Sequence, residues 1–293
     1  MLIERLAIIG VGLIGGSLAR ALRLAGEVGE VVGCGRTLPN LHEAVELGVI
    51  DRYTQDPAEA VQGADLVFLA VPLGAMAGVL RAIRPHLGAD AVITDGGSVK
   101  GSLVADAISV FDQVPPNMVL GHPIAGTENS GVAASFAELY RNRRVILTPV
   151  ESTNAAALAK VQAMWRACGA EVTLMEVRHH DEILAATSHL PHMLAFSLVD
   201  VLSRMKENDE IFRYAAGGFR DFTRIASSNP VMWRDICVAN RHALRGMLRD
   251  FADELHLLAQ ALDEPDGDRL LEIFQRAKAA RDRYVDGVQE PNP

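Results

Sequence analysis

The first 176 residues alternate short apolar runs with longer amphipathic segments. The apolar runs have the length and β-branched content of buried strands, which we expect at residues 6–9, 30–34, 66–71, 92–95, 118–120, 144–147 and 171–174. Helix-length segments separate these runs, a pattern that is typical of βαβ units and a parallel sheet. Because such crossovers are right-handed, the pattern predicts a doubly wound α/β domain over residues 1–176.

The pattern changes to long helices in residues 177–293, where no convincing strand appears. We expect helices over residues 181–205, 230–258 and 269–283, with a turn at residues 264–267. Asp181 is placed to cap the first helix, and Asn229 followed by Pro230 is a typical helix start. The long apolar stripe of the second helix either packs within the chain or forms a homodimer interface.

Composition narrows the class of protein and its partners. The chain has 293 residues, enough for two full cores, and 49% hydrophobic with 22% charged residues is ordinary for a globular protein. A net charge of -9 argues against nucleic-acid or anionic-membrane partners but allows a local basic pocket for a small anion.

Compartment and metal content can be judged from the cysteines and the N-terminus. The three cysteines are odd in number and contain no CxxC pair, which fits a reducing cytosol and provides no disulfide or zinc framework. The apolar run at residues 6–9 leads into a glycine-rich turn and not a cleavage site, and no run approaches the ~20 residues of a membrane span. We therefore expect a cytoplasmic protein.

A glycine-rich segment follows the first predicted strand directly and opens a helix at residues 18–24. Gly10, Gly12 and Gly15 form the pattern GxGxxG in the context that dinucleotide binding requires. Gly10 permits the tight turn, Gly12 lets the backbone approach the pyrophosphate, and Gly15 allows close packing of helix on strand. The domain is therefore predicted to be a Rossmann-type domain, with cofactor contacts from Gly10, Gly12, Leu13, Ile14, Gly15, Arg36, Thr37, Val71 and Ser98.

The end of the second predicted strand favours NADP over NAD. NAD enzymes carry an acid here for the ribose hydroxyls, whereas this chain has Gly35, Arg36 and Thr37. Arg36 can bind a 2′-phosphate through two nitrogens, and Thr37 can donate a hydrogen bond to it. An exposed arginine beside a tolerant NAD site is the alternative, so NAD remains possible.

Candidate catalytic residues follow the strands that end at the same edge of the sheet. His122 comes directly after the strand at residues 118–120, in a Gly/Pro loop, and is placed to accept a proton near neutral pH. Ser98 follows the strand at residues 92–95 and could bond His122, bond the cofactor or cap the next helix. Glu128 in the loop of His122 is either a substrate contact or a solvated charge.

The helical half contributes two further polar pairs. Ser188 and His192 lie four residues apart and share a helix face. His189 and His192 are close enough to suggest a metal, but no third ligand motif accompanies them. Arg220 and Arg224 are also four residues apart, beside a Gly pair. They either capture a dicarboxylate or form surface pairs with nearby aspartates.

Taken together, these segments resemble the prephenate/arogenate (cyclohexadienyl) dehydrogenase family of tyrosine biosynthesis. The resemblance runs in order through nearly the whole chain, in GVGLIGGS (10–17), DGGSVKG (95–101), GHPIAGTENSG (121–131), TSHLPH (187–192) and GGFRDFTRIASSNPVMWRDI (217–236). The last block is long enough to be highly specific. The family resemblance implies an NAD(P)-dependent oxidative decarboxylation in which the substrate ring becomes aromatic.

The resemblance also implies roles for the candidate residues. His122 would accept the hydroxyl proton as hydride leaves the ring, and Ser98 would orient His122. Arg224 would bind the ring carboxylate, while the side-chain end of the substrate would face Arg220, His192 and Ser188. No metal is needed, because the nicotinamide carries the redox chemistry.

One departure from the family and two alternative functions bear on the assignment. Residues 35–37 look like those of the NADP-using branch, which often prefers arogenate to prephenate. A β-hydroxyacid dehydrogenase would need a catalytic lysine in the helical half, where Lys206, in a charged turn, is the only lysine between residues 160 and 278. A non-catalytic NADP-binding sensor is the other alternative. The chain end at Pro293 leads us to expect no fused mutase or regulatory domain.

Overall fold

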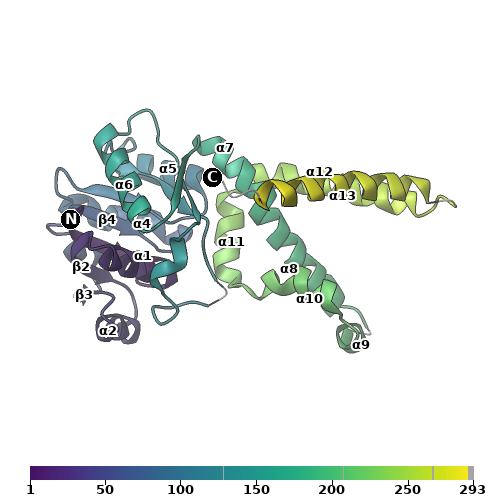
Figure 1. The fold of residues 1–293 in the computed structure, drawn as a ribbon, viewed down its shortest axis with the longest axis horizontal. Helices are drawn as coiled ribbons and strands as arrows, with labels where there is room; N and C mark the ends of the chain where they lie inside the picture. The colour runs from purple at the N-terminus through teal and green to yellow at the C-terminus, as the bar shows by residue number, and fades with distance from the viewer. Residues whose placement is uncertain (128, 207, 266, 290–293) are drawn as a thin grey trace. The chain divides into compact units, whose positions relative to one another are not determined.

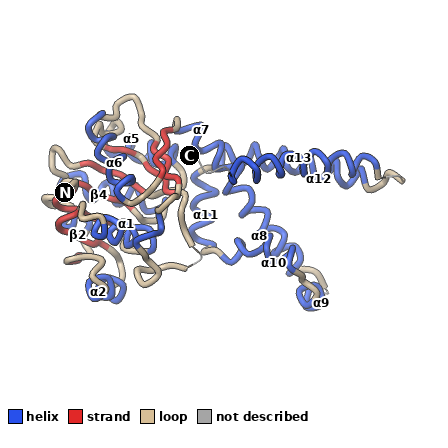
Figure 2. The backbone as a smooth tube through the Cα atoms, in the orientation of Figure 1, coloured by secondary structure: helices blue, strands red, loops and turns tan. Residues whose placement is uncertain are grey.

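A computed structural model describes residues 1–127, 129–206, 208–265 and 267–289 (Figure 1). The chain divides into two compact units, Met1–Leu244 and Arg245–Pro293. All the strands of the described residues lie in the first unit, and Figure 2 shows them in red. Across the described residues, no helix has the length and apolarity needed to span a bilayer.

Six parallel strands form the larger sheet, in the order β3-β2-β1-β4-β5-β6. Their bounds are β1 (Ile3–Ile9), β2 (Val28–Cys34), β3 (Arg52–Thr54), β4 (Leu66–Leu69), β5 (Val92–Asp95) and β6 (Met118–Val119). The strand order reverses between β1 and β4, as in a Rossmann fold. The predicted Rossmann-type doubly wound sheet is therefore confirmed, although β3 has too few residues to give a recognisable pattern.

Helices cover both faces of this sheet. The helical elements of this part are α1 (Leu13–Leu24), α2 (Leu38–Glu46), α3 (Pro57–Ala60), η1 (Leu73–Ala75), α4 (Met76–Ile83), η2 (Arg84–His86), α5 (Lys100–Phe111), η3 (Ala137–Tyr140) and α6 (Ala155–Ala167). Alternate residues of β1 separate the two cores, with Leu6 and Ile8 facing α1 and α6 and Ala7 and Ile9 facing α4 and α5. Helix α1 begins at Leu13, earlier than the predicted residue 18.

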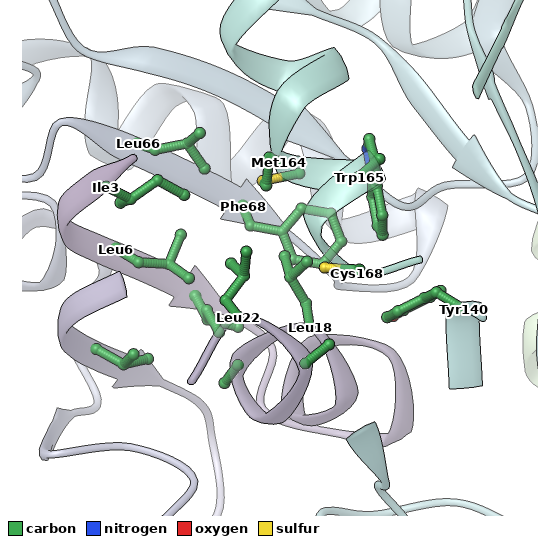
Figure 3. Packing of buried hydrophobic residues seen from close by; sticks show 14 of the residues in the cluster. Ile3, Leu6, Leu18, Leu22, Leu66, Phe68, Tyr140, Met164, Trp165 and Cys168 are labelled. Carbon is green, nitrogen blue, oxygen red and sulfur yellow. The ribbon is translucent and has the colours of Figure 1, made fainter. Parts of the chain in front are cut away.

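Aromatic rings fill the core between the sheet and α6 (Figure 3). The Trp165 ring packs edge-on against Phe68, with centroids 5.8 Å apart, and against Tyr140, with centroids 5.0 Å apart. All three side chains are fully buried. Edge-to-face packing of this kind adds about 0.5–1.5 kcal/mol per pair beyond the burial itself. This core holds β4 and α1 in place beneath the glycine-rich loop.

The last two predicted strands do not extend the parallel sheet. They lie in a separate three-stranded sheet, in the order β7-β8-β9. The central strand β8 (Arg144–Leu147) pairs with β9 (Glu171–Leu174) on one side and with an unpredicted strand, β7 (Gly121–Pro123), on the other. β7 runs antiparallel to β8. The chain leaves the large sheet at Leu120, and only the three residues of β7 pair with β8, so the segment resembled a loop in the sequence.

The remaining helical elements of the first unit follow β9. Its elements are α7 (Val177–Leu184), η4 (Ala185–His189), α8 (Leu190–Ser203), α9 (Asn208–Arg213), α10 (Gly217–Thr223), η5 (Arg224–Ser227) and α11 (Pro230–Ala239). The prediction that Asp181 caps the first of these helices is wrong. Glu176 does so instead, accepting a hydrogen bond from the His179 amide at 2.8 Å, and Asp181 lies inside α7.

The helix predicted over residues 181–205 is interrupted by a π-helical turn. This turn, η4, ends two residues before Pro191. Proline has no amide hydrogen to donate to the carbonyl four residues earlier, so regular α-helical bonding fails at this point. Widened turns of this kind are frequent at functional sites.

The helix predicted over residues 230–258 is divided into α11 and α12 (Arg241–Ala261). Asn229 caps α11 as expected, accepting from the amides of Val231 and Met232. The break falls at Asn240, whose side-chain amide donates to the Asp181 carbonyl at 2.8 Å. The last helix, α13 (Asp268–Gln289), contains the predicted residues 269–283 and is longer at both ends.

A small apolar cluster holds α11 against the sheet edge where β5 ends. Val99 of the loop after β5 packs with Trp233 and Ile236 of α11. Because Val99 lies one residue after Ser98, this contact brings the helical half to the same edge as the loop at Ser98.

Candidate active site

The glycine-rich loop after β1 is shaped by close backbone contacts. Gly10 has φ +105°, and a Cβ there would lie 2.3 Å from the carbonyl oxygen of Ala70. A Cβ on Gly15 would lie 2.3 Å from the Gly10 carbonyl oxygen. A Cβ on Gly12, in contrast, would meet nothing within 4 Å, and no side chain caps α1. The space before the amides of Leu13 and Ile14 therefore fits an anion such as a pyrophosphate.

The side chain of Arg36 lies at the edge next to this loop, after β2. Arg36 is exposed, and its guanidinium has no hydrogen bond or ion pair within the part of the chain that the structure describes. Its carbonyl accepts from Gln55 at 2.6 Å, which holds the backbone. Thr37 is the N-cap residue of α2, and its side chain makes no capping hydrogen bond. Val71, two residues past β4, packs on the core at the loop's other side.

A buried ion pair between the end of β5 and the start of α5 holds the first residue of β7. Lys100 and Asp95 have fully buried side chains, and the Lys100 ammonium contacts an Asp95 carboxylate oxygen. The ammonium also donates to the Gly121 carbonyl at 2.5 Å, while the other Asp95 oxygen accepts from the Gly121 amide at 2.9 Å. Burial lowers the pKa of Lys100, and the Asp95 carboxylate opposes this change. The pair fixes the residue next to His122.

His122 lies in β7, with 8% of its surface exposed. Its Nδ1 lies 2.9 Å from Nε2 of His180, which comes from α7. Burial, reinforced by the positive charge of Lys100, holds the pKa of His122 well below 6.5. The imidazole is therefore neutral at pH 7, as a proton acceptor must be.

Asp181 connects this histidine pair to the start of α5. Its carboxylate accepts from the backbone amides of Lys100 at 2.9 Å and Gly101 at 2.8 Å, and it lies 2.8 Å from Nδ1 of His180. Burial opposes ionisation of Asp181, but these hydrogen bonds hold its pKa below the usual value. Two residues that the sequence did not assign to the site, His180 and Asp181, thus stand directly behind His122.

Ser98 and Glu128 are the other residues expected near His122. Ser98 is half-buried in the loop between β5 and α5, and the structure records no hydrogen bond between it and His122. The hydrogen-bond partner of His122 is His180. Glu128 lies outside the described residues.

Ser188 and His192 are in contact, as their spacing predicts, but the contact is made by the backbone carbonyl of Ser188 and not by its side chain. Nδ1 of His192 donates to the Ser188 carbonyl at 2.9 Å, which leaves Nε2 as the acceptor of a neutral ring. The ring stacks on Trp233, with centroids 3.5 Å apart and planes 19° apart. Burial lowers the pKa of His192, and the positive charge of Arg224 lowers it further. The Arg224 guanidinium therefore interacts electrostatically with this ring.

Arg220 and Arg224 occupy the end of α10 and the start of η5. Both side chains are exposed, and neither makes a hydrogen bond or ion pair within the described residues. The alternative, in which these arginines form surface pairs with Asp221 and Asp235, is not seen within the described residues, and Asp235 pairs instead with Arg234 at 2.7 Å. Both cations are therefore available to an anion.

His189 is a further buried histidine, which lies outside the predicted site residues. Its Nδ1 accepts from the Asn240 side chain at 3.0 Å, so the proton of the neutral ring sits on Nε2. Burial lowers the pKa of His189 to about 4. Among the described residues, no group of three or more His, Cys, Asp or Glu side chains is arranged to hold a metal ion.

A Rossmann sheet with an open glycine-rich loop and a buried neutral histidine at the same edge defines an NAD(P)-dependent oxidoreductase. The family model described as the nucleotide-binding domain of prephenate dehydrogenase matches residues 18–174, and the model of its dimerization domain matches residues 176–276. The chain belongs to the prephenate dehydrogenase family.

Individual relatives agree with this family along the whole chain. The chain is 41% identical to a cyclohexadienyl dehydrogenase of Zymomonas mobilis over 95% of each chain. It is 34% identical to the prephenate dehydrogenase of Bacillus subtilis, over 95% of this chain and 76% of that one. Prephenate dehydrogenase of A. aeolicus, solved with hydroxyphenyl propionate and NAD+, superimposes with a TM-score of 0.89 at 37% identity, covering 96% and 98% of the two chains. Arogenate dehydrogenase of Synechocystis gives 0.80 at 29% identity, covering 96% and 100%.

Proposed function

We propose that the protein catalyses the NADP-dependent oxidative decarboxylation of arogenate or prephenate in tyrosine biosynthesis. The observation that carries this proposal is the buried, neutral His122 at the sheet edge that also carries the glycine-rich loop. The activities of the relatives supply the substrate class.

In this proposal His122 accepts and returns the proton, and a bound nicotinamide cofactor would supply the hydride acceptor. Nε2 of His122 accepts the proton of the ring hydroxyl as hydride leaves the carbon that bears it. The ring carboxylate departs as carbon dioxide, its bonding electrons make the ring aromatic, and the ring oxygen regains a proton from His122. One substrate and one oxidised cofactor thus give a phenol, carbon dioxide and the reduced cofactor, and the histidine is regenerated.

The remaining candidates are proposed as binding residues. Arg224 pairs with the ring carboxylate, and Ser98 contacts the cofactor. The side-chain end of the substrate faces Arg220, His192 and Ser188. The support for this assignment is that both arginines are exposed and lack protein partners within the described residues, whereas the acceptor Nε2 of His192 is set by its bond to Ser188.

The proposed NADP preference rests on the edge after β2. Gly35 stands where an NAD enzyme carries an acid, and the guanidinium of the adjacent Arg36 is exposed with no partner among the described residues. An unpaired guanidinium there is suited to a 2′-phosphate. The A. aeolicus relative was solved with NAD+, so the preference for NADP and the lean toward arogenate are features proposed for this chain.

We further propose a dinucleotide-binding domain over residues 1–176 and a helical substrate and dimerisation domain over residues 177–293. The support is that the two family models meet between residues 174 and 176, and that the second describes a dimerization domain. The proposed assembly is a homodimer formed through the helical domain, located in the cytoplasm. The expected partner is a small-molecule substrate and not a nucleic acid.

The experiment is a two-by-two assay of the purified protein, with prephenate or arogenate and with NAD or NADP. We expect turnover with higher kcat/KM for NADP, and with arogenate at least as good a substrate as prephenate. Better efficiency with NAD would remove the proposed role of Arg36. NADPH binding without turnover of either substrate would favour the sensor, and turnover of a β-hydroxyacid alone would favour that class of dehydrogenase.

A further inference from the structure

Three buried polar side chains form a line that ends at His122. The Asp181 carboxylate contacts Nδ1 of His180 at 2.8 Å, and Nε2 of His180 contacts Nδ1 of His122 at 2.9 Å. The His180 side chain is fully buried, and that of Asp181 is 13% exposed. His122 comes from β7, whereas His180 and Asp181 come from α7, 58 residues further along the chain.

The hydrogen bonds of Asp181 define where the protons of this line lie. Its carboxylate already accepts from the backbone amides of Lys100 and Gly101 and is ionised, so it cannot donate. Nδ1 of His180 must therefore carry a proton and donate it to Asp181. When both rings are neutral, Nε2 of His180 then holds a lone pair and accepts a hydrogen bond from the protonated Nδ1 of His122.

The consequence concerns the other nitrogen of His122. A neutral imidazole carries one proton, so a proton on Nδ1 leaves Nε2 with its lone pair. The opposite tautomer would place a proton on Nε2, and that nitrogen could not accept one. The identity of the atom that faces the substrate hydroxyl thus depends on a residue that touches neither substrate nor cofactor in the proposed reaction.

We propose that His180, held by Asp181, is a positioning residue that keeps His122 in the tautomer with Nδ1 protonated and Nε2 free. When His122 takes up a proton, the ionised Asp181 stabilises the positive charge through His180. This proposal rests on the proposed role of His122 as proton acceptor. Its first part, the tautomer, can be tested whether or not the enzyme turns over.

His180 is a cleaner position for a test than Asp181. Asp181 also holds the first amides of α5, so its replacement would disturb the start of that helix. His180→Leu removes the acceptor that faces His122. His180→Gln can retain it, because the side-chain oxygen of glutamine reaches about as far as Nε2 of histidine and accepts a hydrogen bond.

The experiment measures histidine tautomers by proton–nitrogen correlation NMR on protein labelled with [15N]histidine, with His122→Asn to assign the His122 signals. We expect the Nδ1-protonated tautomer of His122 in wild type and His180→Gln, and a mixed or reversed tautomer in His180→Leu. His189, whose Nδ1 accepts from Asn240, is the internal control and should remain Nε2-protonated in every variant. An Nε2-protonated His122 in wild type would overturn the proposal, whether or not either His180 variant folds.

Kinetics of the same variants provide a second readout. With NADPH binding and thermal unfolding matched to wild type, His180→Leu should lower kcat by about ten- to a hundredfold while KM changes little, and His180→Gln should recover part of the loss. An unchanged kcat in His180→Leu would overturn the proposal. Failure of the wild type to turn over any substrate, with the expected tautomer present, would count against the proposed function and not against the tautomer.

Discussion

The proposed site comprises two regions that are built in opposite ways. The region around His122 is buried, and its polar atoms are held by Lys100, His180 and Asp181. The region around Arg220 and Arg224 is exposed, and these cations make no hydrogen bond or ion pair among the described residues. Proton transfer needs a fixed atom with a lowered pKa, which burial supplies. Anion capture needs free cations that the ligand itself can order.

The comparison predicts the largest loss of turnover at the buried end. His122→Asn should lower kcat by about 10²–10⁴-fold, because no group then accepts the hydroxyl proton. NADPH binding should persist, since the glycine-rich loop is unchanged, and steady-state kinetics with a binding titration would measure both. Activity within about tenfold of wild type would remove His122 from the catalytic role.

At the exposed end, we expect a substitution to change mainly the substrate KM. Arg224→Ala should raise the substrate KM by an amount equivalent to about 2–5 kcal/mol, because the ring carboxylate loses its partner when it is buried in the complex. Arg213→Ala, which removes another exposed arginine of the helical half, is the matched control and should leave KM unchanged. An unchanged KM in Arg224→Ala would exclude the contact.

A smaller effect is expected at the cofactor edge. Arg36→Ala should raise KM for NADP by about ten- to a hundredfold, the loss of one or two charge-assisted hydrogen bonds. KM for NAD is the internal control and should stay within about twofold, since NAD has no 2′-phosphate for the arginine to bind. Equal changes for both cofactors would show that Arg36 serves the loop and not the phosphate.

The buried end should also make stability depend on pH. The pKa values of His122 and His189 are lowered by burial in the folded protein, that of His189 to about 4, whereas both titrate near 6.5 when unfolded. As pH falls from 6.5 towards 4, the unfolded chain binds protons that the folded protein does not. The free energy of unfolding should therefore fall, by up to about 1.4 kcal/mol per pH unit for each histidine.

Urea unfolding at a series of pH values would measure this slope. His189→Phe should flatten the slope relative to wild type, because that histidine no longer binds a proton on unfolding. A free energy of unfolding that stays constant between pH 6.5 and 4 would contradict the burial of neutral histidines.

The two regions also differ in how well the sequence predicts them. The glycine-rich loop and the cap at Asn229 follow local rules, so pattern and spacing were sufficient to predict them. The pairing of Ser188 with His192 was likewise predictable from their spacing of four residues. The spacing did not show that His192 contacts the backbone carbonyl of Ser188.

Long-range pairing explains what the sequence could not predict. β7 has only three residues and forms because β8 pairs with it, so His122 was expected in a loop. His180 lies 58 residues from His122, and nothing near either residue indicates their contact. Asp181 was expected to cap its own helix, whereas it caps α5, which is a property of the tertiary fold. Lys100, five residues after Asp95 at the end of a predicted strand, was the available signal for the buried pair.

The most direct test of the central assignment is a crystal structure of the protein with oxidised cofactor and a non-reacting substrate analogue that keeps the ring hydroxyl. We predict that Nε2 of His122 lies within about 2.6–3.2 Å of that hydroxyl oxygen, with the carboxylate on Arg224. A hydroxyl directed to another group, with His122 beyond hydrogen-bonding reach, would contradict His122 as the proton acceptor.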